Sequence, residues 1–243
     1  MGTMKIKLYD ETPEHKKNFL KLIDENYYDG VLFHRVIKNF MIQGGDPDSK
    51  TAKKGQTLGS GGPGYTIPAE FNSMFIHKKG ALSAARTGGP SNPEMRSSGS
   101  QFYVVQGQTY TDEQLNQMEE RAEIDKIGKF IKPFIEDPKN ESIKKEIEIL
   151  QKANNRQGLD SIVKVITTLI KKQHPEIKFQ KYTKQQRETY KTIGGTPYLD
   201  GAYTVYGEVI EGIKIIDKIA NVETNKGDRP IEDVKIISVK VVK

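Results

Sequence analysis

The sequence predicts a mainly β protein, a closed antiparallel barrel that is interrupted by an α-helical insertion at residues 111–193. The first indication is the distribution of glycine, because only 2 of the 22 glycines lie in the 83 residues of this stretch. The remaining 160 residues also hold 8 of the 11 prolines, a turn-rich composition typical of sheets. The second indication is a series of short segments in which polar and apolar residues alternate, without a parallel βαβ rhythm.

The N-terminal part is expected to begin with a strand and a helix. Residues 5–9 alternate between polar and apolar side chains, which is the period of a half-buried strand. A threonine followed by Pro13 suits an N-cap and a first helical position, so we predict a helix at 13–26. Two apolar runs then predict strands at 31–37 and 40–43.

A long loop follows, and the other sheet elements lie beyond it. Residues 44–64 are almost all turn formers and polar residues, which predicts an exposed loop. Further elements are predicted as strands at 80–85, 101–106, 203–209 and 234–242 and as a short amphipathic helix at 212–220. Strands at both ends of the chain favour closure of the sheet, because a closed barrel has no unpaired edges.

The insertion is predicted to contain three or four helices with apolar stripes. A capping box at Thr111 begins the first helix, and Asp137 with the proline after it begins the second. Asp160 is expected to cap the next helix, which stops at His174, and Thr183 to begin the last. We expect the stripes to form a core rather than a groove for a partner, since an isolated helix has no other source of stability.

Composition excludes several classes of protein. With 35% hydrophobic residues, a mean hydropathy of −0.64 and no apolar run near the roughly 20 residues that cross a bilayer, we expect a soluble chain that does not bind membranes. Cysteine is absent, which excludes disulfides and thiolate catalysis. The N-terminus lacks the pattern of a signal peptide, so we expect a cytoplasmic protein, or a periplasmic or exported one if a signal has been removed.

The positive charge does not indicate nucleic-acid binding. The net charge of +6 is divided equally between the insertion and the rest of the chain. Acidic and basic residues are evenly mixed, and no basic run is interleaved with aromatic residues as a single-strand binder requires. We therefore expect no nucleic-acid partner.

Neither the glycine motif at residues 59–64 nor the four histidines indicate a ligand site. Residues 59–64 have the G-x-G-x-x-G spelling of a dinucleotide site, but such a site needs a strand before the glycines and a helix after them, and Pro68 argues against the helix. The histidines have none of the close spacings that metal sites use; they are His15, His34, His77 and His174. We expect neither a cofactor nor a metal.

The segment at residues 33–46 is unusual. Strand alternation places Phe33, Arg35 and Ile37 on one face, so a cation shares a side with apolar residues. Taken alone, this pattern favours an edge-strand cation whose stem lies on apolar surface.

The wider sequence changes that interpretation, because residues 28–44 resemble the signature of cyclophilins, the barrel-type peptidyl-prolyl cis-trans isomerases. Further blocks are similar to the family in the same order, at residues 5–9, 59–62, 99–103 and 199–209. The resemblance covers essentially the whole chain outside the insertion. It implies a bacterial-like member with a closed eight-stranded antiparallel barrel and two capping helices, formed by residues 1–110 and 194–243.

The resemblance implies an enzyme that assists protein folding by catalysing rotation about X–Pro bonds. The barrier to this rotation is about 18–20 kcal/mol, and the enzyme must stabilise a twisted amide whose prolyl nitrogen regains its lone pair. Arg35 is the donor that we expect to bind this nitrogen, because a guanidinium is always charged and offers a rigid fork. The alternative is a chaperone or interaction module that binds proline peptides and turns them over incidentally.

Family analogy implies the rest of the site. The catalytic group would be Arg35, Gln43 and Gln101. The substrate-binding group would be Phe40, Met41, Ala85, Arg86, Tyr103, Tyr198, Leu199 and Tyr203. Tyr103 stands where many relatives have Phe, and we expect its hydroxyl at the rim of the pocket. Arg86 is the least secure of these assignments, because the loop at 86–98 is longer than usual.

The same analogy implies the partners. They would be unfolded or flexible polypeptides that contain proline. A cyclosporin-type ligand would bind weakly, because Tyr198 replaces the Trp of many eukaryotic members. We expect a monomer, which is the family default.

Overall fold

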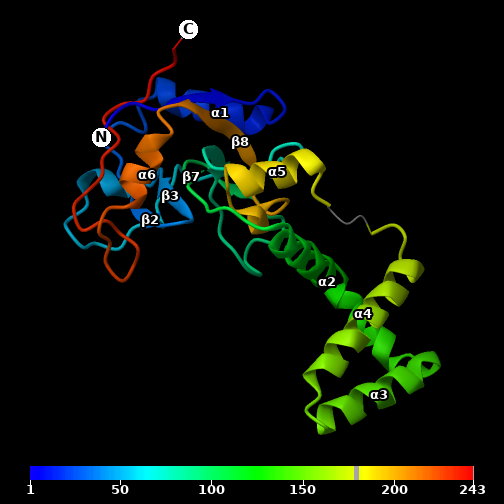
Figure 1. The fold of residues 1–243 in the computed structure, drawn as a ribbon. Coiled ribbons are helices and arrows are strands. Elements are labelled where there is room, and N and C mark those ends of the chain that lie inside the picture. The colour runs from blue at the N-terminus through cyan, green and yellow to red at the C-terminus, as the bar shows by residue number, and fades with distance from the viewer. Residues whose placement is uncertain (178–180, 243) are drawn as a thin grey trace. The chain divides into compact units, whose positions relative to one another are not determined.

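The computed structural model describes residues 1–177 and 181–242. The chain forms two compact units, one of residues 1–111 with 183–243 and the other of residues 112–182. Figure 1 shows the first unit, which contains the sheet and both ends of the chain, and the second unit, which is helical. We call the first the sheet unit and the second the helical unit.

The sheet unit is built on six antiparallel strands in the order β1-β8-β5-β7-β3-β2. Their bounds are β1 Lys5–Leu8, β2 Arg35–Ile37, β3 Met41–Gly44, β5 Ala81–Ala84, β7 Phe102–Val105 and β8 Val205–Glu211. A separate pair consists of β4 Thr66–Ile67 and β6 Ser97–Ser98. All predicted strands outside the insertion except the C-terminal one are therefore present, although several are shorter than predicted.

The register of the central strands sorts their side chains onto two faces. Arg35 is opposite Gln43, Gln43 is opposite Tyr103, and Tyr103 is opposite Ser83, so one row crosses four strands on one face. On the other face the central row packs into the main core and consists of Val36, Ile42, Val104 and Leu82. Because side chains alternate along a strand, each residue of the polar row is adjacent in sequence to a residue of the apolar row.

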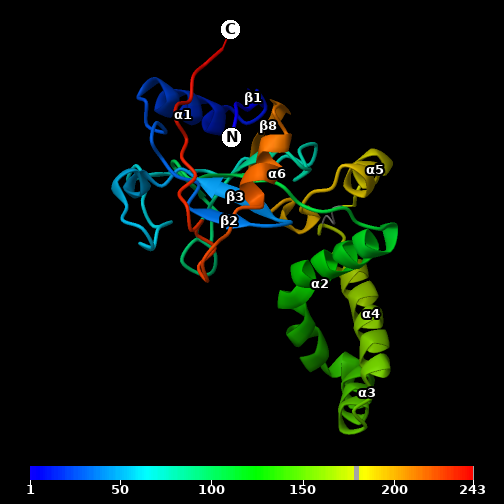
Figure 2. The ribbon, with the colours of Figure 1, turned by 60° about the vertical axis from the view of Figure 1, so that its left-hand side comes forward.

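Three helices complete the sheet unit. They are α1 Pro13–Asp24, α5 Lys184–Thr192 and α6 Lys214–Ala220. Phe19 and Leu22 of α1, together with Ile216 and Ile219 of α6, are buried in the core on the apolar face of the sheet. Figure 2 shows α6 lying over β3 and β2. Thr183 begins α5 with the capping box that the sequence predicts.

The predicted closed eight-stranded barrel and the mainly β class are both wrong. Among the described residues no strand joins β1 to β2, so the main sheet has two edges, and helical residues outnumber strand residues. The predicted strand at 234–242 makes only a short pairing with residues 30–33, in which the Phe33 amide donates to Val234 O and the Ile236 amide donates to Val31 O, both at 2.8 Å.

The segment at 234–242 does not form a continuous strand, because much of its backbone has no hydrogen-bond partner and many of its side chains are not buried. The Leu32 amide donates to Ser49 Oγ at 3.0 Å, so the first half of the predicted strand at 31–37 does not extend the ladder of β2. Beyond Ile236 the side chains of Ile237, Val241 and Val242 are exposed, Ile237 by 80%, and Val239 is only partly buried. Alternation alone does not form a strand when the backbone has no continuous partner.

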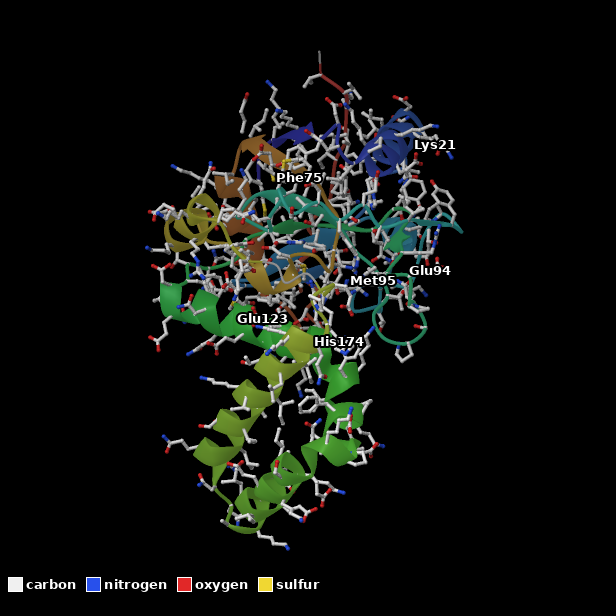
Figure 3. The ribbon with its side chains drawn as sticks, turned by 90° about the vertical axis from the view of Figure 1, so that its right-hand side faces the viewer. Lys21, Phe75, Glu94, Met95, Glu123 and His174 are labelled. Carbon is white, nitrogen blue, oxygen red and sulfur yellow. The ribbon has the colours of Figure 1, made fainter. Side chains whose placement is uncertain are left out.

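Two loops border the polar face of the sheet. The first follows β3, begins with the 3₁₀ helix η1 Pro47–Thr51 and continues through the glycines at 55–64. The second joins β5 to β6 and contains Glu94 and Met95, which are labelled in Figure 3. Arg96 of this second loop donates to Thr66 Oγ1 at 2.7 Å and so anchors it to β4.

The helical unit consists of α2 Asp112–Glu136, α3 Glu141–Lys152 and α4 Arg156–Gln173. Its core is apolar, as the stripes predict, and includes Ile127, Phe134 and Ile166. Glu123, labelled in Figure 3, is 10% exposed at its side chain and pairs with Lys171 and Lys181. A buried carboxylate of this kind needs such partners to offset its desolvation.

One predicted helix boundary in this unit is wrong. Asn155, not Asp160, caps α4, and its side chain accepts from the amide of Gly158 at 2.9 Å. Gly158 therefore lies inside the first turn of α4 instead of ending the helix before it. An asparagine at the N-cap accepts a hydrogen bond from an amide that has no partner within the helix. The stabilisation from this bond outweighs the low helix propensity of glycine.

The described residues contain neither a membrane-spanning helix nor a cluster of metal-ligating side chains. None of the helices there is long and apolar enough to cross a membrane. Within residues 1–177 and 181–242, no three His, Asp or Glu side chains are grouped as a metal ion would need.

Candidate active site

The polar face of the sheet opens into a cavity of about 660 Å³. It lies over the row that crosses β2, β3 and β7, and the loops after β3 and β5 form part of its wall. The predicted site residues that line it are Arg35, Phe40, Met41, Gln43, Ala85, Arg86, Tyr103, Leu199 and Tyr203. The structure thus brings together nine of the eleven predicted residues, from segments far apart in the sequence.

The floor of the cavity is apolar and closely packed. Met41 is 1% exposed and Tyr103 is 4% exposed, and both belong to a cluster that Phe40, Leu199 and Tyr203 join from the sides. The rings of Tyr103 and Tyr203 meet edge to face with their centres 5.9 Å apart. Such a floor offers a dry surface to an apolar ring of a ligand.

Arg35 provides the positive charge beside this floor. Its Nη1 donates to Gln43 Oε1 at 3.4 Å, and its Nε lies 3.4 Å from Asp228 Oδ2. The side chain is 42% exposed, so the guanidinium is held from two sides and still reaches the cavity. The Asp228 contact was not foreseen, because this residue lies in a turn that carries no local sign of function.

A chain of amide groups links Arg35 to the glycine loop. Gln43 Nε2 donates to Gln101 Oε1 at 3.1 Å, and Gln101 Nε2 donates to the carbonyls of Gly59 and Gly61 at 2.9 and 2.8 Å. Gln101 is 7% exposed and does not line the cavity. It therefore holds Gln43 and the loop from behind the site.

The residues expected at the rim lie as follows. Arg86 donates from Nε to Ala202 O at 2.9 Å and stacks 4.5 Å above the ring of Tyr203. The amide of Ala85 donates to Gln101 O at 3.0 Å. Tyr198 is 53% exposed and does not line the cavity, although its ring centre is 5.9 Å from that of Phe40.

The hydroxyl of Tyr103 is not at the rim, contrary to expectation. It lies 3.0 Å from His77 Nε2, behind the floor, and the His77 side chain is fully buried. Burial raises the pKa of the Tyr103 hydroxyl well above its usual range. Because the strand twist and the packing of the ring fix this direction, the sequence alone gave no indication of it.

The far wall of the cavity comes from residues that sequence reasoning did not select. It includes the loop at 55–59, the turn at 225–227, His34 and Arg229. Burial lowers the pKa of His34. His34, directly before Arg35, was a signal for this wall, but the two loops carry no local sign of function.

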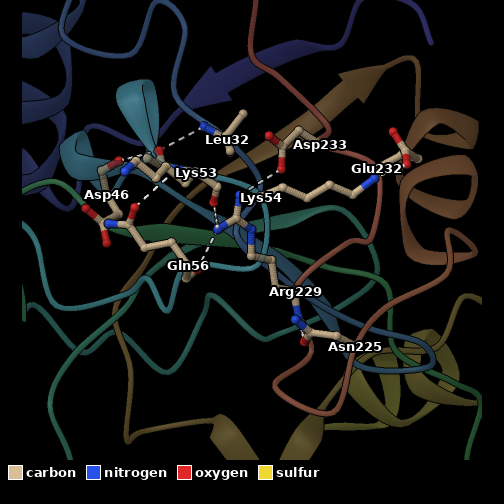
Figure 4. Close-up of polar contacts among 10 residues, drawn as sticks. Leu32, Asp46, Lys53, Lys54, Gln56, Asn225, Arg229, Glu232 and Asp233 are labelled. Atoms are coloured by element: carbon tan, nitrogen blue, oxygen red, sulfur yellow. Dashed lines mark hydrogen bonds and ion pairs between the residues drawn. The ribbon is translucent and has the colours of Figure 1, made fainter.

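Arg229 ties the two loops together, as Figure 4 shows. Its Nη1 donates to the carbonyls of Lys53 and Gln56, and its Nη2 donates to Asp233 Oδ1 at 2.9 Å. Lys54 also pairs with Glu232 at 2.6 Å. Because Arg229 is only 5% exposed, its role at the far wall of the cavity is structural.

The sheet and the cavity on its polar face belong to a family of isomerases. Residues 1–119 and 126–241 match the family described as cyclophilin type peptidyl-prolyl cis-trans isomerase/CLD, and the chain belongs to this family. Its members catalyse rotation about X–Pro peptide bonds, and peptidyl-prolyl cis-trans isomerisation is the function of this chain.

Individual relatives agree with this assignment. A Staphylococcus epidermidis protein named for peptidyl-prolyl cis-trans isomerase activity is 30% identical over 99% of this chain and 87% of its own length. A Streptococcus pyogenes protein named as a bifunctional phosphatase and peptidyl-prolyl cis-trans isomerase is 32% identical over 99% of this chain, which spans only 37% of that protein.

A solved structure shares the fold. The cyclophilin-type peptidyl-prolyl cis-trans isomerase of Cryptosporidium parvum, crystallised in the presence of the dipeptide Ala-Pro, has a TM-score of 0.53 and 21% identity. The match covers 98% of this chain and 90% of that one.

Proposed function

We propose that the cavity over β2, β3 and β7 is the site of X–Pro rotation and that it acts on flexible polypeptide segments. The observation that carries the proposal is the position of Arg35. Its guanidinium is held by Gln43 and Asp228 beside the buried floor of Met41 and Tyr103. A proline ring on this floor would bring its nitrogen beside a fixed cationic donor.

The proposed mechanism makes and breaks no covalent bond. The floor holds the proline ring while the preceding carbonyl turns out of the amide plane, and resonance is lost. The prolyl nitrogen then regains its lone pair, and Arg35 donates a hydrogen bond to it. A rate increase of about five decades requires about 7 kcal/mol, whereas one preorganised donor contributes about 3–4 kcal/mol. Selection of the twisted geometry on the dry floor supplies the rest.

The other predicted residues support these two elements. Gln43 touches the cavity and orients both Arg35 and the substrate carbonyl. Gln101 acts as a positioning residue, since it holds Gln43 and the glycine loop without lining the cavity. Ala85 and Arg86 meet the peptide backbone, and Tyr198 forms an outer rim beside Phe40.

The proposal also concerns ligands and the helical unit. Tyr198 stands where many eukaryotic members of the family have Trp, so a cyclosporin-type ligand binds weakly. The helical unit is an insertion in the catalytic unit.

The test is isomerisation of a short Ala-Pro peptide, measured by exchange spectroscopy on the intact chain. We expect turnover by the natural protein and a loss of about 100-fold or more in kcat/KM for Arg35→Ala, in line with the loss of one preorganised donor. Arg156→Ala, which removes an arginine from α4 of the helical unit, serves as the matched control and should leave kcat/KM unchanged.

The same experiment separates catalysis from simple binding. A protein that binds the peptide but accelerates its exchange no more than buffer does would be a proline-binding module. Equal activity of the natural protein and Arg35→Ala would refute the role of Arg35 itself.

A further inference from the structure

A line of buried polar side chains runs from the floor of the cavity to helix α5. The Tyr103 hydroxyl lies 3.0 Å from His77 Nε2, and His77 Nδ1 lies 2.7 Å from Asp200 Oδ1. Asp200 Oδ2 accepts from the hydroxyl of Tyr190 at 2.5 Å. The side chains of His77 and Asp200 are 0% and 3% exposed, and Tyr190 is fully buried. Of these side chains, only the ring of Tyr103 takes part in the proposed isomerisation.

The hydrogen bonds along the line have definite directions. Asp200 Oδ1 accepts from the backbone amide of His77 at 2.8 Å as well as from its ring. The ring proton is therefore on Nδ1, and in the neutral imidazole Nε2 is left to accept the hydroxyl proton of Tyr103. Asp200 in this way fixes the tautomer and the orientation of His77, and His77 fixes the hydroxyl of Tyr103.

Burial makes such a line costly unless it is complete. Desolvation of a carboxylate, an imidazole and two hydroxyls is offset only when each group finds its partner. The floor needs no hydroxyl for its own packing, because the ring of Tyr103 alone supplies the apolar surface. The hydroxyl is thus explained by its contact with His77.

The far end of the line is anchored where the chain returns from the helical unit. Tyr190 lies on α5, and its carbonyl accepts from the amide of Tyr110 at 3.1 Å. Nearby, Gly195 pairs with Gln108, and a Cβ at Gly195 would lie 2.2 Å from the carbonyl of His77. Gly195 therefore packs directly against the backbone of His77, and the segment at 108–110 holds the segment at 190–195.

We propose that His77, Asp200 and Tyr190 are positioning residues that act through the hydroxyl of Tyr103 on the floor of the proline pocket. The inference rests on the proposed function of that pocket. Through these residues the segment that follows the helical unit fixes the floor on which proline rotates. A loss anywhere along the line lets the ring of Tyr103 move, and this lowers the rate of rotation more than the affinity for the peptide.

The test is a double-mutant cycle between the two ends of the line. Tyr103→Phe and Tyr190→Phe each remove one hydroxyl and keep the ring. We expect each to lower kcat by about 3- to 10-fold, with KM changed less than twofold. Because both act through one line, Tyr190→Phe should cause no further loss in the Tyr103→Phe background.

A neighbouring tyrosine provides the matched control. Tyr110 is 7% exposed, and its ring packs edge to face against the ring of Tyr190. Its hydroxyl is not one of the groups that link Tyr103 to Tyr190. Tyr110→Phe should leave kcat unchanged, alone and combined with Tyr103→Phe. Melting temperatures of all variants separate a loss of turnover from a loss of folded protein, and Asp200→Asn replaces Tyr190→Phe if the latter does not fold.

The outcomes distinguish this inference from the proposed function. If Arg35→Ala abolishes turnover while Tyr190→Phe has no more effect than Tyr110→Phe, the positioning role is refuted and the function stands. Additive losses in the double variant would also refute it. If the natural protein has no turnover, the function and the positioning role fail together.

Discussion

Replacement of Gln101 by alanine should lower turnover far beyond what its effect on stability explains. The side chain makes three hydrogen bonds, one from Gln43 and two to the carbonyls of Gly59 and Gly61. At a net value of about 1 kcal/mol for each bond, their loss costs about 3 kcal/mol of unfolding free energy. For a chain of this size, this corresponds to about 6–12 °C in melting temperature.

The effect on activity follows from geometry. Without Gln101, Gln43 loses the partner that aims its carbonyl at Arg35, and the glycine loop loses its anchor. Misplacement of a donor by about 1 Å can cost 100-fold, so we expect kcat/KM to fall by about 10- to 100-fold. Peptide isomerisation by exchange spectroscopy and a melting curve of the same sample measure the two effects.

A residue of the same type provides the control. Gln106 is also 7% exposed and makes two hydrogen bonds, from the Asn39 amide at 2.6 Å and to Asp217 at 3.1 Å. Gln106→Ala should lose about 2 kcal/mol and keep kcat/KM within about threefold at a temperature where it is folded. Similar losses of activity in both variants would mean that Gln101 acts only through stability, and the reasoning would be refuted.

Two further predictions concern stability. Gly45→Ala should cost about 3 kcal/mol or more in chemical denaturation, because φ is +95° and the new Cβ would lie 2.2 Å from Ser100 O; a cost below about 1 kcal/mol would contradict the close approach. Burial holds the pKa of His15 and His34 below the ordinary 6.5, so the unfolded chain takes up these protons first and stability falls as pH falls below about 6.5. Melting curves between pH 7.5 and 5.5 should show this decline, and a flat profile would exclude it.

Much of the sheet and the central row of the site could be predicted from the sequence. Alternation at 31–37 and 40–43 placed Arg35 and Gln43 each on a definite face, and the observed register puts the two side chains on one row. Local patterns succeed here because a strand has a fixed period of two residues and a short turn fixes its register with the next.

The parts that failed depend on distant partners. Closure of the barrel was expected because strands were predicted at both ends of the chain, but a strand at 234–242 needs a continuous partner, and the amide of Leu32 is bound to Ser49 instead. The contact of Asp228 with Arg35 joins residues far apart in the chain, and no local pattern encodes it. The direction of the Tyr103 hydroxyl depends likewise on a histidine in another segment.

The paired segments at the base of the helical unit have a consequence for how the chain can be altered. Gln108 and Gly195 exchange backbone hydrogen bonds, so the chain is closed into a loop at these two residues, inside the sheet unit. The entropy that is lost when this loop closes grows only slowly with the number of residues in the loop. A change of length within residues 112–182 should therefore leave the pairing of Gln108 with Gly195 in place.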